Sequence, residues 1–406
     1  MTAPDTRAAA DLPIGRRVAR LRTRLGISQQ VFADRVGRSV SWVDKVERGV
    51  RRLDRVSVIE LVAQALGVTP DLLLDQDPRP EPATGTAAAV DRVRAALACY
   101  DPPGAHRGPP PPATPELADQ VGYAWAAYRH AQHPQVLRLL PDLLTAARRT
   151  PRSAPTTDPL VRVYRLAAHV LVKLGEPDLA WLAADRAIGT AVSDPHRTGL
   201  AVIPLAQALR SLDRGRLALA ATITAVHRLA PPPAREPAPA EAALAGTLLV
   251  QAALAAAGCG DASSAHELTV RATDLAHGYG DKLDHDGADE LGFGPTVVEI
   301  ARALVALELG DNERAIATHL EVTGSDRWPR LPAEHRAAHL IDITRAYLNV
   351  GDHRAAGHAL VTADRLAPAE TRLRPAARTA LAAVLRAGPA LADVTGLATA
   401  VGLMRQ

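Results

Sequence analysis

The stretch GISQQVFADRVGRSVSWVDKVERG, residues 26–49, decides the fold of the N-terminal part of the chain. Ser28 and Ser39 each stand directly before a short segment with helical periodicity, where a serine side chain can accept a hydrogen bond from a first-turn amide. Gly37 lies between the two segments and readily takes the positive φ of a tight turn. The pattern predicts two short helices joined by a glycine-centred turn, which is a helix-turn-helix arrangement.

The residues around this stretch complete a small helical bundle. Residues 14–25 place their apolar side chains on one helical face and arginines on the others, and residues 58–66 show a similar apolar pattern. The segment DLLL at 71–74 predicts one further helical turn. We therefore predict a flexible tail over residues 1–12 and a helix-turn-helix domain of five helices over residues 13–75.

Charge is distributed unevenly along the chain. The formal net charge is only +3, from 47 basic and 44 acidic residues, yet Ile14–Val56 contains twelve basic and four acidic residues. The rest of the chain is therefore acidic overall. A basic segment on an acidic chain predicts contact with a polyanion, with a solvated helix face as the alternative.

Residues 16–74 resemble the xenobiotic-response-element type of helix-turn-helix, the family of phage repressors. The resemblance implies that Ser39–Arg48 is a recognition helix that lies in the major groove of DNA. It also implies a set of DNA-binding residues: Gln29, Arg38, Ser39, Val40, Ser41, Trp42, Lys45, Arg48, Arg51 and Arg52.

The members of this set have different implied roles. Gln29, at the start of the preceding helix, falls where the family contacts backbone phosphate, and the arginines flanking the recognition helix are further phosphate contacts. Val40, Ser41 and Trp42 stand at positions where the family often has Gln, Asn or Arg, so direct hydrogen bonding to bases is reduced and Val40 suits a thymine methyl group. Trp42 is expected either to contact DNA or to pack on the flank of the helix.

Residues 76–115 are rich in proline and predict a linker, which one helix over residues 87–99 interrupts. Aromatic residues make up only 3% of the chain, so its core must consist of Ala, Leu and Val, which favours closely packed helices over sheets. The predicted fold class is all-α.

Residues 116–406 contain a repeated hinge. The segments GEPDLA, GRLALA, GDASSA, GDNERA and GDHRAA begin at glycines 175, 215, 260, 310 and 351, and each follows a helical segment and precedes another. We expect the glycine to take the left-handed cap position and the aspartate of three hinges to favour the start of the new helix. Glu116–Arg149 is expected to form a first hairpin without the glycine, and Arg372–Met404 a terminal cap. The pattern predicts a solenoid of helical hairpins.

The repeat unit resembles a degenerate tetratricopeptide repeat, and the whole layout resembles actinobacterial regulators that join this helix-turn-helix to such repeats. Resemblance to the peptide-responsive regulators of Gram-positive bacteria implies a groove that takes a peptide, a small molecule or a protein. The candidate ligand-binding residues are Thr296, His335, His339, Asp342 and Arg345. The alternatives are a structural ion pair between Asp342 and Arg345 and a repeat domain that only dimerises.

Several function classes are not expected. No phosphate-binding, dinucleotide-binding, zinc-protease or serine-hydrolase motif is present, so we expect no enzyme and no cofactor. The acidic cluster over residues 281–290 lacks the spacing of a calcium loop, and two isolated cysteines exclude a disulfide framework, so we expect no metal site. The N-terminus has no hydrophobic signal region and residues 242–257 are shorter than the ~20 residues of a membrane span, which predicts a cytoplasmic protein.

These observations predict a homodimeric, sequence-specific transcriptional regulator that binds double-stranded DNA at a near-palindromic operator. Its repeat domain is expected to dimerise and to sense a peptide or small-molecule effector. The alternative is a repeat-based scaffold or adaptor protein with a vestigial helix-turn-helix.

Overall fold

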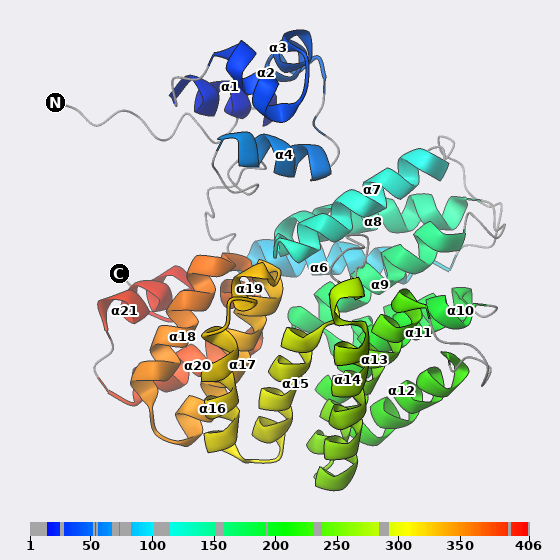
Figure 1. Ribbon diagram of the computed structural model, residues 1–406, viewed down its shortest axis with the longest axis vertical. Helices are drawn as coiled ribbons and strands as arrows, with labels where there is room; N and C mark the ends of the chain where they lie inside the picture. Colours follow the sequence, from blue (N-terminus) through cyan, green and yellow to red (C-terminus); the bar gives the residue numbers. More distant parts are fainter. Residues whose placement is uncertain are drawn as a thin grey trace. The chain divides into compact units, whose positions relative to one another are not determined.

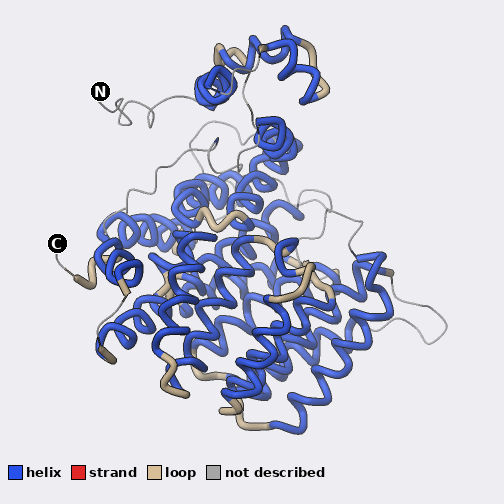
Figure 2. Tube along the Cα trace, turned by 60° about the vertical axis from the view of Figure 1, so that its left-hand side comes forward, coloured by secondary structure: helices blue, strands red, loops and turns tan. Residues whose placement is uncertain are grey.

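The computed structural model of the chain describes residues 14–24, 28–51, 53, 56–66, 73, 83–100, 114–150, 157–191, 194–229, 238–283, 292–388 and 391–404. Across these ranges the regular secondary structure is helical and contains no strand (Figure 2). The all-α prediction is therefore confirmed. The chain divides into two compact units, Met1–Glu81 and Pro82–Gln406, which are described separately below.

The first unit contains helices α1 (Ile14–Arg24), α2 (Gln29–Val36), α3 (Val40–Glu47) and α4 (Val56–Leu66). Its core is small and apolar, and the fully buried side chains include Val18, Phe32, Val43, Val62 and Leu73. Leu73 is the one described residue of the predicted fifth helix. The predicted tail over residues 1–12 lies outside the described residues.

The helix-turn-helix predicted from residues 26–49 is present. The backbone N–H of Val31 donates to Ser28 Oγ at 3.2 Å, and that of Trp42 donates to Ser39 Oγ at 3.2 Å, so both serines cap their helices. Gly37 has a φ of 62° and ends α2, and Gly49 has a φ of 75° just after α3. These four residues fix where α2 and α3 begin and end.

The second unit is a row of helix hairpins (Figure 1). Its helices are α6 (Ala83–Leu97), α7 (Thr114–Arg129), α8 (His133–Arg149), α9 (Thr157–Lys173), α10 (Pro177–Thr190), α11 (Pro195–Ser211), α12 (Gly215–Leu229), α13 (Pro239–Gly258), α14 (Ala262–Leu283), α15 (Pro295–Glu308), α16 (Asn312–Thr323), η2 (Trp328–Arg330), α17 (Ala333–Asn349), α18 (His353–Leu366), α19 (Pro368–Leu373), α20 (Pro375–Arg386) and α21 (Ala392–Ala400).

The hairpins stack in sequence order. The first helices of successive hairpins, α7, α9, α11, α13, α15, α17 and α20, pack on one another, and each second helix also contacts the first helix of the next hairpin. The shared core consists mainly of Ala, Leu and Val. This nearest-neighbour packing is that of a helical solenoid, as the repeated hinge predicts.

Four of the five predicted hinge glycines take the left-handed conformation, with φ between 75° and 84° at Gly175, Gly260, Gly310 and Gly351. The aspartates that follow the last three of these glycines cap the next helix, because each carboxylate accepts a hydrogen bond from a first-turn amide. The hairpin α7–α8 lacks a hinge glycine, and Ala131 takes the left-handed position there, with a φ of 56°.

The fifth hinge differs from the prediction. The left-handed residue before α12 is Asp213, with a φ of 58°, whereas Gly215 is the first residue of the helix itself. A Cβ on Gly215 would lie 2.7 Å from Cys259 Sγ and 3.2 Å from the carbonyl oxygen of Ala255. Gly215 therefore permits a close approach of α12 to the end of α13 and does not shape the turn.

The helix predicted over residues 87–99 also differs. It spans Ala83–Leu97 as α6, and it packs on α8 and α10 instead of standing alone in a linker. The physical reason is its apolar face, because Ala89, Val90, Val93 and Leu97 are buried in the core shared with α7 to α11. The proline-rich segments on either side, residues 76–82 and 101–113, lie outside the described residues.

The two ends of the hairpin row meet. Helix α7 contacts α17, and α8 contacts α19. Ala131, in the turn between α7 and α8, is buried in the core formed by the C-terminal hairpins. At the next turn a Cβ on Gly175 would lie only 2.7 Å from Cγ of Pro375, so α9 and the start of α20 are in close contact. The second unit is thus a closed solenoid.

Helix α13 is long and apolar enough, by length and composition, to cross a membrane. Most of its side chains are buried within the second unit, as in the core helix of a helical domain.

Candidate nucleic-acid interface and polar contacts of the second unit

Helix α3 presents a polar outer face. Val43 and Val46 are buried against the rest of the first unit, which turns the opposite side of the helix outward. Ser39, Ser41 and Lys45 are exposed there, and Val40 is half-buried. The residues predicted to meet base edges therefore lie on the side of α3 that the unit leaves accessible.

Basic side chains surround this face. Arg38, Arg48 and Arg51 are exposed in and beside α3. Nη2 of Arg48 lies 2.5 Å from a carboxylate oxygen of Asp44, but both side chains are more than 40% exposed, so water and salt screen the pair. Arg52 lies outside the described residues.

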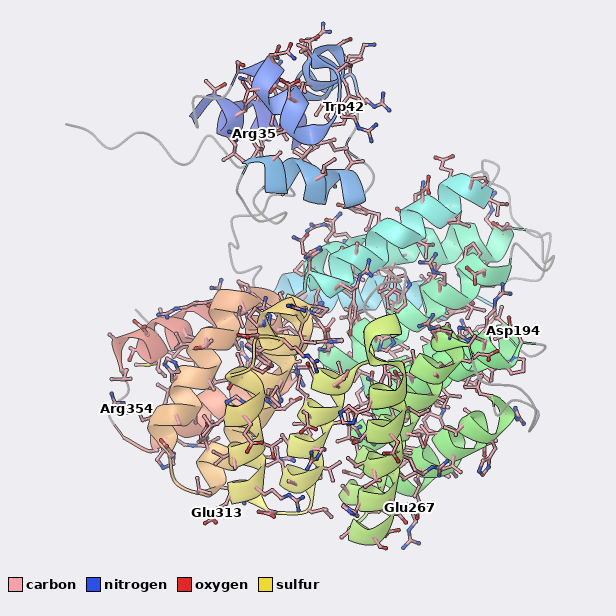
Figure 3. All side chains as sticks on the ribbon, in the orientation of Figure 1. Arg35, Trp42, Asp194, Glu267, Glu313 and Arg354 are labelled. Atoms are coloured by element: carbon pink, nitrogen blue, oxygen red, sulfur yellow. The ribbon has the colours of Figure 1, made fainter. Side chains whose placement is uncertain are left out.

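Trp42 lies at the surface of the first unit (Figure 3). Its indole ring is half-buried, and the guanidinium of Arg38 lies over it, 5.9 Å from the ring centre. Such a cation–π contact restricts the arginine side chain. The structure thus places the ring beside a predicted phosphate-binding arginine and outside the buried core.

Gln29 is held by a residue that the sequence analysis missed. Its side-chain amide donates to Oε2 of Glu47 at 2.7 Å, and Glu47 also accepts hydrogen bonds from Nε of Arg22 at 2.6 Å and from Nη2 of Arg22 at 3.1 Å. The Glu47 side chain is only 7% exposed. These contacts tie α1, α2 and α3 together, and the part of the chain that the structure describes provides no acceptor for the second amide N–H of Gln29. The available sequence signal was the position of Glu47, four residues after the buried Val43 on one helical face.

A buried group of charged and polar side chains joins the ends of the closed solenoid. We call His133, Lys173, Glu334, Glu370 and Arg374 the closing cluster. Oε1 of Glu370 lies 2.7 Å from Nε2 of His133 and 2.9 Å from Nζ of Lys173. Lys173 also donates to Glu334, and Nη1 of Arg374 donates to Oε2 of Glu370 at 3.4 Å. Both glutamates are at most 4% exposed.

The cations of the closing cluster keep both glutamates ionised. Burial by itself raises the pKa of Glu370, but Lys173, His133 and Arg374 outweigh it and hold that pKa well below its usual range. Burial also raises the pKa of Glu334, but the charge of Lys173 outweighs burial and lowers that pKa below its usual value. For Lys173, the two carboxylates outweigh burial and raise its pKa. The cluster is therefore a set of mutually dependent buried charges.

A second set of polar contacts links the first helices of neighbouring hairpins. We call it the polar row, and its members are His169, Gln207, Arg210, Gln251, Glu308 and Arg345. Nδ1 of His169 lies 3.2 Å from Oε1 of Gln207, Nη1 of Arg210 donates to Oε1 of Gln251 at 3.2 Å, and Nη2 of Arg345 donates to Oε1 of Glu308 at 2.6 Å. Burial and the charge of Arg165 lower the pKa of His169 to about 3, so its ring is neutral.

The predicted ligand-binding residues do not form one site. His335, Asp342 and Arg345 share one face of α17, and His335 lies next to Gly292, just before the first turn of α15 that contains the half-buried Thr296. His339 lies apart from them: it is buried, and its Nε2 is 2.9 Å from Nδ1 of His319. Burial lowers the pKa of His339 to about 3, so this pair is an uncharged core contact.

The proposed ion pair between Asp342 and Arg345 is wrong. Asp342 accepts a hydrogen bond from Nη2 of Arg374 at 2.8 Å, while Arg345 pairs with Glu308. Each side chain points to a different neighbouring helix, so the i,i+3 spacing does not bring them together. The partner of Arg345 belongs to the polar row, and the partner of Asp342 belongs to the closing cluster.

Within the described residues, no group of three or more His, Cys, Asp or Glu side chains could hold a metal ion. The side chains of the acidic cluster over residues 281–290 lie outside the described residues.

A family model described as a helix-turn-helix domain matches residues 13–75. The first unit contains a helix-turn-helix domain. The match covers α1 to α4 and therefore includes α2, α3 and the turn between them. No curated protein sequence matches the chain.

Two solved structures are similar to the chain at 12% sequence identity. One is PlcR of Bacillus thuringiensis in complex with the peptide PapR7 and DNA, with a TM-score of 0.33 over 67% of this chain and 99% of that chain. The other is aspartyl phosphate phosphatase F of Bacillus subtilis, with a TM-score of 0.44 over 90% of this chain and 96% of that chain. Similarity at this level carries no argument about what the present chain binds. The helix-turn-helix domain and the contacts above provide the basis for the functional proposal.

Proposed function

We propose that this protein is a sequence-specific, DNA-binding transcriptional regulator. The observation that carries the proposal is the outer face of α3 in the helix-turn-helix domain, where Ser39, Ser41 and Lys45 are exposed and arginines flank them. Exposed polar side chains on a helix read base edges, and exposed arginines beside it bind phosphate. The proposal assigns the protein no catalytic activity.

In this proposal α3 lies in the major groove. Lys45 and Ser41 hydrogen bond to base edges and Val40 contacts a thymine methyl group. Arg38 and the arginines after α3 bind phosphates, and the free amide N–H of Gln29 contacts the backbone at the start of α2.

The second unit is proposed to dimerise and to sense a peptide or small-molecule effector in the cytoplasm. A homodimer would present two copies of α3 to half-sites about one helical turn, ~34 Å, apart on a near-palindromic operator. Effector binding in the solenoid would then change the spacing of the two helix-turn-helix domains. The solenoid supports this proposal because stacked hairpins provide an extended surface with many polar side chains.

The test is selection of genomic fragments with the purified full chain, with and without cell extract, followed by fluorescence anisotropy across salt concentrations. Affinity should fall with salt at a log–log slope near −0.9 per phosphate contact. Arg38→Ala should weaken binding to all sequences about equally, whereas Ser41→Ala and Lys45→Ala should also relax sequence preference. Arg354→Ala, at an exposed position in the second unit, is the matched control.

Two results would contradict the proposal. A complex insensitive to salt would exclude phosphate-driven docking. Normal binding by the variants at 38, 41 and 45 would show that α3 is not the recognition helix, and absence of any DNA binding would favour a scaffold or adaptor protein.

A further inference from the structure

The polar row contains two arginines. Arg345 donates to the carboxylate of Glu308, whereas Arg210 donates to a neutral amide. Within the described part of the chain, its guanidinium donates to Oε1 of Gln251 and forms no ion pair. Its side chain lies near the C-terminal end of α11 and remains partly exposed. An arginine has five N–H donors, so most of the donors of Arg210 stay available.

The neighbouring residue Gln251 also offers a donor. Because Oε1 of Gln251 accepts from Arg210, the amide NH₂ group of Gln251 points away from that bond.

The carboxylates around Arg210 already have their own partners. Burial lowers the pKa of Arg210, and the negative charges of Glu308 and Asp342 oppose that effect. Glu308 is paired with Arg345 at 2.6 Å, and Asp342 is paired with Arg374 at 2.8 Å. An arginine stays charged when partly buried, and among the described residues no carboxylate forms a direct ion pair with Arg210.

We propose that Arg210, together with the amide of Gln251, binds the carboxylate group of an effector. A planar guanidinium beside an amide donor matches a carboxylate, because two N–H groups can donate to its two oxygens. The inference rests on the proposed function, that the second unit senses an effector. The carboxylate can belong to a small organic acid or to the C-terminus of a peptide, and the test separates these sources.

The test measures thermal unfolding and titration calorimetry of the full chain with four probes. These are acetate, succinate, a pool of random pentapeptides with free C-termini, and the same pool with amidated C-termini. The expected result is binding of a free-acid probe and at least tenfold weaker binding of the amidated pool. Binding of acetate or succinate as tight as that of the free peptides identifies a small organic acid, and binding of the free peptides alone identifies a peptide C-terminus.

Substitutions locate the site. Arg210→Gln should weaken binding of the free-acid probe at least tenfold, and Arg210→Lys should weaken it less, because the charge remains but the planar fork is lost. Gln251→Glu should also abolish binding, because a carboxylate at that position pairs with Arg210 internally and leaves the fold intact. Arg302→Gln is the control, since it removes an exposed arginine paired with Glu299 on α15.

Equal binding of amidated and free peptides would overturn the inference, as would no binding of any free-acid probe or unchanged binding by the Arg210→Gln and Gln251→Glu variants. Release of the protein from its operator by cell extract tests the proposed function separately. If the extract still acts on the Gln251→Glu variant as on the wild type, an effector is sensed elsewhere and only the carboxylate site fails.

Discussion

The two units use arginine and lysine in opposite ways. Around α3 the cations Arg38, Lys45 and Arg51 are exposed to solvent. In the closing cluster Lys173 and Arg374 are at most 16% exposed, and they hold carboxylates that are more deeply buried. Solvent-exposed cations contribute little to the stability of the folded protein. Removal of a cation that is paired with a buried carboxylate, in contrast, strongly destabilises the fold. The same residue types are therefore proposed to serve binding around α3, and they serve stability in the closing cluster.

The closing cluster should show the largest effect. Lys173→Met leaves Glu334 and Glu370 buried with less compensation, so the free energy of unfolding of the second unit should fall by about 3–5 kcal/mol. Urea denaturation of the full chain, monitored by tryptophan fluorescence, measures the change. Arg354→Met, at an exposed position on α18, should change stability by less than ~0.5 kcal/mol. If Lys173→Met lowered the free energy of unfolding by less than ~1 kcal/mol, the closing cluster would not have the stabilising role assigned to it.

Glu47 tests whether the first unit also depends on a buried charge. Glu47→Ala removes the acceptor for Arg22 and Gln29, and we expect a loss of about 2–3 kcal/mol in the stability of the helix-turn-helix domain. Asp44→Ala on the same helix removes only a screened pair with Arg48 and should cost less than ~1 kcal/mol. Hydrogen exchange of α1 to α3 would compare the two variants, and equal protection would contradict the assigned role of Glu47.

Acid should destabilise the second unit at a pH at which the exposed cations around α3 do not change their charge. Burial lowers the pKa of His339 to about 3, against about 6.5 when unfolded, so the folded state resists a proton that the unfolded chain accepts. This stability is present above pH ~6.5 and is lost as the pH falls, by about 2 kcal/mol for His339 between pH 7 and pH 5. Denaturation of the wild-type protein and of the His339→Phe variant at several pH values measures the contribution of His339 to the free energy of unfolding. An identical pH dependence in both proteins would refute this contribution.

The smallest expected effect concerns Trp42. Trp42→Ala removes the ring under Arg38, and a contact of this kind is worth about 0.5–1 kcal/mol at an exposed site, so DNA affinity should fall about two- to fivefold. In a double-mutant cycle with Arg38→Ala the two losses should not add, because both act on the same phosphate contact. Full additivity would show that Trp42 contacts DNA independently of Arg38.

Local chemistry made much of the fold predictable from the sequence. The caps at Ser28 and Ser39 and the positive φ of Gly37 follow from residue types next to the helices that they end. The hinges at Gly260, Gly310 and Gly351 follow from a Gly-Asp pair, where the glycine turns the chain and the aspartate caps the next helix. Each of these signals lies within a few residues of the feature that it produces.

The polar contacts of the second unit could not be predicted from local sequence patterns, because the residues that form them are far apart in the chain. His133 and Glu370 are separated by 237 residues, and Lys173 and Glu334 by 161. No periodicity relates such positions, so Asp342 and Arg345 were paired with each other instead of with Arg374 and Glu308. The left-handed conformation of Asp213 in place of Gly215 was also not predictable from local sequence. Glycine is required at 215 because Cys259, which is distant in the chain, packs against it.

The closed solenoid has a consequence for how the chain acquires its structure. Ribosomes release the N-terminal hairpins first, and Lys173 emerges long before Glu370, which is 197 residues further on. Until then its ammonium group stays hydrated, since a single buried cation would be costly. Hairpins can form and stack one by one from local contacts, whereas the joining of the two ends requires a loop of nearly two hundred residues to close. Closure is therefore the last step of folding, and any truncation before Glu370 leaves the ring open.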